Sequence, residues 1–147
     1  MWISKHYKKE NTMVYITRRV TFSAAHRLHN PELSDEENRQ IYGLCNNPMG
    51  HGHNYVVEVT VHGEPSLRDG MIIDLGELND VIQDRIIKHV DHKFLNHQVD
   101  FLEGVIPTAE NLSIKFWERL KDALPRGELY EIRVSESENN SAFYRGE

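Results

Sequence analysis

Apolar side chains recur at every second position between residues 14 and 28, as at Val20 and Phe22. This period of two, carried by β-branched and aromatic residues, predicts a strand with one buried face. The same alternation predicts three further strands, at about 53–62, at 129–136 and at about 141–145. The polar loop before the last strand suits a hairpin.

The middle of the chain changes to a helical period. Apolar residues three and four positions apart predict one helix over about 74–89 and another over about 108–124, where Pro125 ends it. In the first connection, Ser34 and Glu37 have the spacing of a capping box and predict a short helix.

The element order is therefore two strands, two helices and two strands. We predict an α+β fold in which a four-stranded antiparallel sheet carries both main helices on one face. The 147 residues are enough for one domain, which we place at 13–147 after a polar N-terminal tail at 1–12.

Composition narrows the class of protein. Apolar residues make up 39% and charged residues 27%, which excludes a disordered or low-complexity chain. The apolar runs are too short to cross a bilayer, and the first dozen residues lack the hydrophobic run of a secretory signal. A single cysteine fits a reducing compartment, and a net charge of −6 argues against nucleic acid as the main partner. We expect a cytoplasmic protein with neither a membrane nor a nucleic-acid partner.

Nine histidines accompany this one cysteine, and three of them fall in a pattern that suits a metal ion. His51 and His53 lie two residues apart at the start of the second strand, so their rings share one face. His26, in the first strand, falls on the matching parity. If the two strands pair, three imidazoles meet and leave a fourth position open, which is the pattern of a catalytic zinc site.

The alternative for these histidines is that they are surface or packed side chains without a common partner. His29 is a second choice for the third ligand, because its parity is opposite. We interpret His6, His62 and His97 as solvated.

Cys45 lies before His51 and has three possible roles: a fourth zinc ligand, a buried inert thiol or a reactive thiolate. As a fourth ligand it would leave no position for a substrate. Asp91 next to His92 suits a carboxylate that orients an imidazole. A histidine after a helix is, however, also favoured by the helix dipole alone.

Three further residues are ambiguous in the same way. Thr108 as an N-cap and Glu110 in the first helical turn are explained by helix chemistry alone. Glu136 has the parity of the apolar residues in its strand. Either the strand ends there and the carboxylate is solvated, or Glu136 is a buried acid that needs a partner with N–H donors.

Several separated motifs resemble those of the 6-pyruvoyl-tetrahydropterin synthase family in its animal-type form. The resemblance covers about 14–147, and its motifs are Phe22–Leu28, Cys45–Tyr55, Asp91–Lys93, Thr108–Asn111 and Glu136 with Asn139 and Asn140. The number and order of these motifs make the resemblance specific, which His-x-His alone would not.

The resemblance implies the tunnelling fold (T-fold), in which three ββααββ subunits close into a barrel. Two such trimers stack into a homohexamer, a dimer of trimers, with active sites at subunit interfaces. The resemblance also implies one Zn²⁺ per subunit, bound by His26, His51 and His53.

The catalytic roles follow from the same resemblance. It assigns Cys45 as the general base, activated by His92 and Asp91. The residues that it places in the pterin pocket are Glu136, as the ring anchor, Thr108 and Glu110. The implied reaction converts 7,8-dihydroneopterin triphosphate to 6-pyruvoyl-tetrahydropterin with loss of triphosphate, a lyase step of tetrahydrobiopterin biosynthesis. Mg²⁺ is implied as a companion of the triphosphate.

A neighbouring family, 6-carboxy-tetrahydropterin synthase of the queuosine pathway, shares the fold, the zinc ligands and the substrate. Its cysteine usually lies closer to His-x-His than Cys45 lies to His51, which favours the pyruvoyl enzyme. Two other hypotheses are a non-catalytic pterin- or metal-binding protein on the same scaffold, and a generic zinc hydrolase. The first would lack one of the motif residues, and the second would need a His-Glu-x-x-His motif, which the sequence does not contain.

Overall fold

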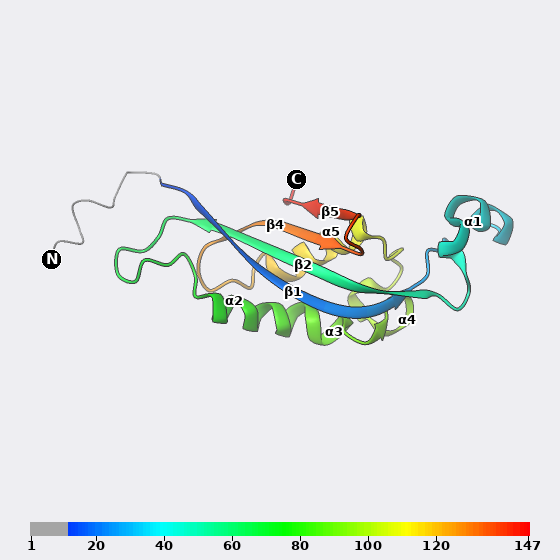
Figure 1. The fold of residues 1–147 in the computed structure, drawn as a ribbon, viewed down its shortest axis with the longest axis horizontal. Helices are drawn as coiled ribbons and strands as arrows, with labels where there is room; N and C mark the ends of the chain where they lie inside the picture. Colours follow the sequence, from blue (N-terminus) through cyan, green and yellow to red (C-terminus); the bar gives the residue numbers. More distant parts are fainter. Residues whose placement is uncertain (1–11) are drawn as a thin grey trace.

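The computed structural model describes residues 12–147, and its main feature is a long, curved sheet with helices on one side (Figure 1). The strands lie in the order β3-β1-β2-β4-β5. Their bounds are β1 (Val14–His26), β2 (His51–Gly63), β3 (Lys93–Phe94), β4 (Glu128–Ser135) and β5 (Ser141–Tyr144). All neighbouring strands are antiparallel except β1 and β3, which run parallel. The α+β class is confirmed, but the expected four-stranded antiparallel sheet gains a fifth strand of two residues.

β1 and β2 form the longest pair and define the two faces of the sheet. Their register places Val20 opposite Val57 and Phe22 opposite Tyr55, and all four side chains are buried under the helices. The predicted parity of the first two strands is therefore correct. β2 begins at His51, slightly earlier than the alternation indicated.

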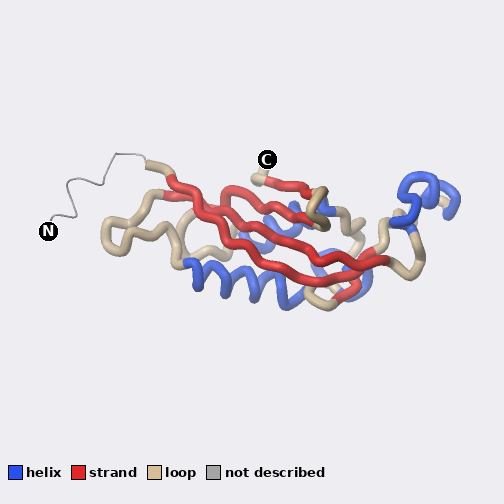
Figure 2. The backbone as a smooth tube through the Cα atoms, in the orientation of Figure 1, coloured by secondary structure: helices blue, strands red, loops and turns tan. Residues whose placement is uncertain are grey.

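A small lobe projects beyond one end of the sheet (Figures 1 and 2). It consists of α1 (Asp35–Tyr42) and the 3-10 turn η1 (Gly43–Asn46). The predicted capping box opens α1: Ser34 Oγ accepts a hydrogen bond from the Glu37 N–H, and the Glu37 carboxylate accepts one from the Ser34 N–H.

The first main helix runs without a break across the middle of the chain. Its segments are α2 (Leu75–Ile82), the π-helical turn η2 (Gln83–Ile87) and α3 (Lys88–Val90). The Asp74 side chain caps its start by accepting a hydrogen bond from the Glu77 N–H. The π turn was not predicted. Its wider turn lets the adjacent side chains of Ile86 and Ile87 both lie in the core.

The second main helix, α5 (Ala109–Leu120), packs on β4 and β5. Thr108 is its N-cap and accepts a hydrogen bond from the Asn111 N–H. The helix ends earlier than predicted, because the chain tightens into a turn in which the Ala123 N–H bonds to the Leu120 carbonyl.

The connection between the two main helices, where the sequence pattern indicates no helix or strand, contains short ordered elements. Besides β3 it contains α4 (Leu95–Gln98) and the 3-10 turn η3 (Asp100–Leu102). Leu95, Val99 and Leu102 are buried there. These elements are too short for a period to identify them in the sequence.

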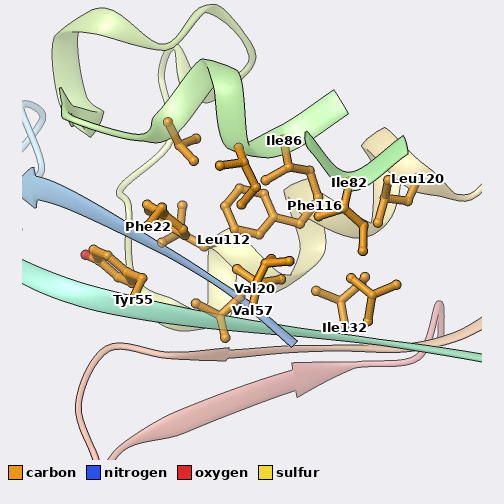
Figure 3. Packing of buried hydrophobic residues seen from close by; sticks show 14 of the residues in the cluster. Val20, Phe22, Tyr55, Val57, Ile82, Ile86, Leu112, Phe116, Leu120 and Ile132 are labelled. Carbon is orange, nitrogen blue, oxygen red and sulfur yellow. The ribbon is translucent and has the colours of Figure 1, made fainter. Parts of the chain in front are cut away.

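The hydrophobic core fills the space between the two main helices and the covered face of the sheet (Figure 3). Ile86 and Phe116 from the helices meet Val57 and Ile132 from the sheet, and all four are fully buried. Within residues 12–147, no helix has the length and apolar character needed to span a membrane.

Candidate functional site

Three histidine rings meet where β1 ends and β2 begins. The register pairs His26 with His51, and Ala24 with His53. One ring nitrogen from each histidine lies within 4.8 Å of the others, and the Nε2 atoms of His26 and His51 are 3.0 Å apart. Nitrogen ligands about 2.0–2.1 Å from a zinc ion lie roughly 3–3.5 Å from one another. The three rings therefore fit one shared metal ion after small side-chain rotations.

His26 is oriented by a contact that the sequence pattern did not reveal. Its Nδ1 donates a 2.7 Å hydrogen bond to the backbone carbonyl of Pro107, at the start of α5. A carbonyl only accepts, so the ring proton is on Nδ1 and the Nε2 lone pair faces the other two rings. The side chain is 1% exposed, and burial lowers the pKa of His26 to about 4. A buried neutral imidazole is the form that binds a metal ion.

Glu136 follows β4 directly and is half-buried. Burial lowers the pKa of His53, and the negative charge of Glu136 partly opposes that shift. Burial raises the pKa of Tyr55, and the Glu136 charge adds to the increase. The strand does end before Glu136, as one alternative held. The carboxylate is nevertheless only partly exposed, and its negative charge shifts the pKa of His53.

Tyr55 is fully buried between the core and the histidines. Its ring stacks on Phe22 with centroids 4.7 Å apart, and it meets His26 and His53 edge-on at 5.9 and 5.5 Å. Figure 3 shows its hydroxyl pointing away from the labelled core residues. That hydroxyl has no hydrogen-bond partner among the described residues.

Asp91 and His92 form a side-chain pair at the edge of β1. The Asp91 carboxylate lies 3.0 Å from His92 Nδ1 and accepts a hydrogen bond from the Ser23 N–H. That bond, with a smaller contribution from His92, lowers the pKa of Asp91. His92 has a φ of 59°, a left-handed conformation uncommon outside glycine, and its side chain is 82% exposed. The imidazole is thus oriented by a carboxylate and faces outward.

A shallow cleft of about 490 Å³ connects the three-histidine group with the Asp91–His92 pair. Its lining includes His53 from the three-histidine group, together with His92 and Lys93 from the segment that forms β3. A ligand in this cleft would meet both groups.

Cys45 lies in η1 and is partly exposed. It is not a member of the three-histidine group. In the part of the chain that the structure describes, its thiol makes no hydrogen bond to Asp91 or His92, whose side chains bond to each other. Within one chain, this thiol and this imidazole are therefore not hydrogen-bonded to each other.

Thr108 and Glu110 occupy the helix positions that the sequence indicated. Thr108 caps α5, and Glu110 is exposed in its first turn. Both follow Pro107, whose carbonyl holds His26, so α5 begins next to the histidine group.

The other histidines lie apart from this group. His29 Nδ1 is 3.0 Å from the Asn46 amide nitrogen, so it does not replace a member of the group. His97 is exposed, as interpreted. His6 and the polar tail up to residue 11 lie outside the described residues.

The interpretation of His62 as solvated is wrong. Its ring packs against Tyr15 and Tyr130, with centroids 5.4 and 5.1 Å away, and its Nδ1 is buried. The alternation of one strand could not show this, because the covering rings come from the two neighbouring strands.

Comparison with known proteins agrees with the motifs. The chain matches the family model described as 6-pyruvoyl tetrahydropterin synthase over residues 15–147. It is 49% identical over 133 residues to the 6-pyruvoyl tetrahydrobiopterin synthase of Poecilia reticulata, a match that covers 90% of each protein. It is 46% identical over 132 residues to that of Homo sapiens, covering 90% of this chain and 91% of the human protein.

A solved structure supports the same relationship. The 6-pyruvoyl tetrahydropterin synthase of Caenorhabditis elegans is 39% identical and superposes with a TM-score of 0.88, covering 92% of this chain and 97% of that one. With the family model matched over nearly its whole length, the chain belongs to the 6-pyruvoyl tetrahydropterin synthase family.

Proposed function

We propose that this protein is a zinc-dependent lyase that converts 7,8-dihydroneopterin triphosphate to 6-pyruvoyl-tetrahydropterin, a step of tetrahydrobiopterin biosynthesis. The observation that carries the proposal is the convergence of three imidazoles at one end of the sheet, with the nearest nitrogens 3.0 Å apart. The names of the animal relatives support the same activity.

His26, His51 and His53 would hold the metal ion. Three nitrogen donors without a carboxylate among the described members of the group favour zinc over magnesium or calcium. When bound, Zn²⁺ supplies a Lewis acid that acidifies the hydroxyls of the substrate side chain and the neighbouring C–H bonds. Burial keeps His26 neutral, and the hydrogen bond to the Pro107 carbonyl orients the ring so that its Nε2 would point at the ion.

Cys45 is the proposed general base, and Asp91 with His92 is the pair that activates it. Asp91 binds His92 at Nδ1, which leaves Nε2 of the exposed ring to take the thiol proton. A thiolate beside an imidazolium removes protons at neutral pH. Because His92 faces outward and does not reach the thiol of its own chain, it would activate Cys45 of a neighbouring subunit.

This inter-subunit arrangement accords with the proposed homohexamer, a dimer of trimeric barrels. In the chain as described, β5 has a neighbour on one side only, and the opposite edge is protected by just two residues of β3. Such edges favour pairing with another copy. Leu44 and Met49, which are 94% and 83% exposed near the projecting lobe, offer further apolar contact surface.

Glu136 is the proposed anchor of the pterin ring. Its half-buried carboxylate would accept charge-assisted hydrogen bonds from the ring N–H and amino groups. Thr108 and Glu110 would line the same pocket from the start of α5. Mg²⁺ would accompany the triphosphate instead of occupying a protein site.

The proposal is tested by incubating the purified protein with Zn²⁺, Mg²⁺ and dihydroneopterin triphosphate and identifying the products. We expect inorganic triphosphate and a pyruvoyl pterin. A carboxy-pterin with acetaldehyde would place the activity with 6-carboxy-tetrahydropterin synthase, and pterin binding without product would indicate a non-catalytic protein.

A substitution separates the base from a metal ligand. Cys45→Ala should abolish turnover while the zinc content stays near one per chain. If zinc is lost together with the thiol, Cys45 is a ligand and the proposed acid–base role is wrong. His97→Ala, at an exposed position, is the matched control and should change neither quantity.

A further inference from the structure

Lys93 stands in a row of side chains that ends at the metal-binding histidines. β3 pairs with β1 so that Lys93 is opposite Ala24, and Ala24 is opposite His53 on β2. Directly paired residues project to the same face of a sheet. Lys93 therefore lies on the face of the histidine group, and only the methyl group of Ala24 stands between it and His53.

The reach of Lys93 matches this placement. Neighbouring strands are about 4.8 Å apart, so the Cα atoms of Lys93 and His53 are separated by roughly 10 Å. The flexible four-carbon stem of a lysine can span much of that distance. Both residues also line the 490 Å³ cleft that joins the histidine group to His92.

Among the described residues, no acidic side chain neutralises the charge of Lys93. Lys88 pairs with Asp84, and Lys115 pairs with Glu118. Lys93, by contrast, is half-buried, and no ion pair within residues 12–147 involves its ammonium group. The described residues that line the cleft also include no aspartate or glutamate. A partly desolvated cation without an ion-pair partner among the described residues attracts an anion.

We propose that Lys93 binds the triphosphate group of the substrate, an inference that rests on the proposed function for the identity of the anion. That group is attached to the same side chain whose hydroxyls would face His26, His51 and His53. An ammonium group is a typical phosphate ligand, acting as a point charge. Lys93 thus holds the leaving group next to the site where its bond breaks.

A second basic cleft, of about 480 Å³, lies under the projecting lobe but is less suited to an anion. Arg27 and Arg39 line it, and so does Asp35. The Arg27 Nε already donates to the Asn46 carbonyl, and Arg39 is paired with Glu36. The positive charge there is largely satisfied within the chain.

The inference is tested with two probes, inorganic tripolyphosphate and unphosphorylated neopterin, by titration calorimetry on the full-length protein. Tripolyphosphate binds zinc itself, so its affinity is measured on protein stripped of metal with a chelator, whereas neopterin is titrated into the zinc-loaded protein. Lys93→Ala should weaken tripolyphosphate binding at least roughly 10-fold and reduce its salt dependence. The affinity for neopterin and the zinc content of the loaded protein should stay at wild-type values.

Three further variants sharpen the result. Lys93→Arg should restore most of the tripolyphosphate affinity, because it keeps the charge. Lys121→Ala, exposed at the far end of α5, should have no effect. Arg39→Ala tests the rival cleft, and loss of tripolyphosphate binding in that variant but not in Lys93→Ala would overturn the inference. Equal losses of neopterin and tripolyphosphate binding in Lys93→Ala would overturn it as well.

The outcomes also separate this inference from the proposed function. Lys93-dependent binding of tripolyphosphate, without any product from dihydroneopterin triphosphate, would sustain the anion site and reject the reaction. Product formation with a KM for dihydroneopterin triphosphate that Lys93→Ala leaves unchanged would sustain the reaction and reject the anion site.

Discussion

The covered face of the β1–β2 pair has two regions with the same geometry and different chemistry. In the middle, Phe22 and Val57 are buried by the apolar side chains of both main helices. At the end of the pair, His26 and His53 continue the same parity and register. There α5 is only beginning, and a polar backbone carbonyl reaches the sheet from Pro107. One strand pattern therefore builds a core where apolar helices cover it, and a group of three histidines that could hold a metal ion where a helix starts.

The largest expected effect comes from removing a proposed metal ligand at the end of the β1–β2 pair. His53→Ala should lower turnover by roughly a thousandfold or more, because a catalytic metal supplies several kcal/mol of transition-state stabilisation. Zinc per chain should fall below one, while the melting temperature of the metal-free protein changes little. Elemental analysis, steady-state rates and thermal denaturation measure the three quantities. A variant that keeps both zinc and activity would show that His53 is not a ligand.

The complementary substitution lies in the middle of the covered face. Phe116 is fully buried, so Phe116→Ala should reduce the free energy of unfolding by about 3–5 kcal/mol. Urea denaturation measures this loss, and Phe143→Ala, at a half-exposed position, is the control with a small effect. The folded fraction should still bind one zinc per chain. Loss of zinc from that fraction would mean that the two regions are not independent.

In metal-free protein, a fall in pH should lower the free energy of unfolding through His26, at the histidine end of the covered face. Folding lowers the pKa of His26 from its ordinary 6.5 to about 4, so between these values the unfolded chain binds a proton that the folded chain does not. The free energy of unfolding should therefore fall as the pH drops from about 6.5 to about 4, and this contribution should level off below that. The expected loss is on the order of a few kcal/mol.

Denaturation of chelator-treated protein at a series of pH values measures this effect. His26→Gln, which cannot take up the proton, should flatten the profile in that window. An unchanged profile in His26→Gln would contradict the assignment.

The smallest effect is expected at the boundary between the regions. Tyr55→Phe removes a buried hydroxyl without a partner among residues 12–147, so stability should stay the same or rise by up to about 1 kcal/mol. Tyr144→Phe is the matched control, because that hydroxyl donates to the Glu147 carbonyl. Thermal denaturation compares the two. A clear loss of stability in Tyr55→Phe would show that its hydroxyl is satisfied in solution.

The features that could be predicted from the sequence are those that depend on neighbours along the chain. The parity of β1 and β2 follows from alternation, and it correctly brought His26 onto the face of His51 and His53. The caps at Ser34, Asp74 and Thr108 depend on the next three residues only.

The features that could not be predicted depend on distant segments. The Pro107 carbonyl lies 81 residues from His26 in the sequence, and the pairing of Lys93 with Ala24 joins a two-residue strand to a long one. No period marks either contact. The proposed partner of Cys45 would lie in another subunit, so neither the sequence pattern nor a single chain places it.

X-ray absorption at the zinc edge of the purified wild-type protein tests the central claim most directly. We expect a first shell of three imidazole nitrogens at about 2.0–2.1 Å with a further light atom and no sulfur. A sulfur shell at about 2.3 Å would make Cys45 a ligand, and protein that binds no zinc would show that the three histidines are not a zinc site.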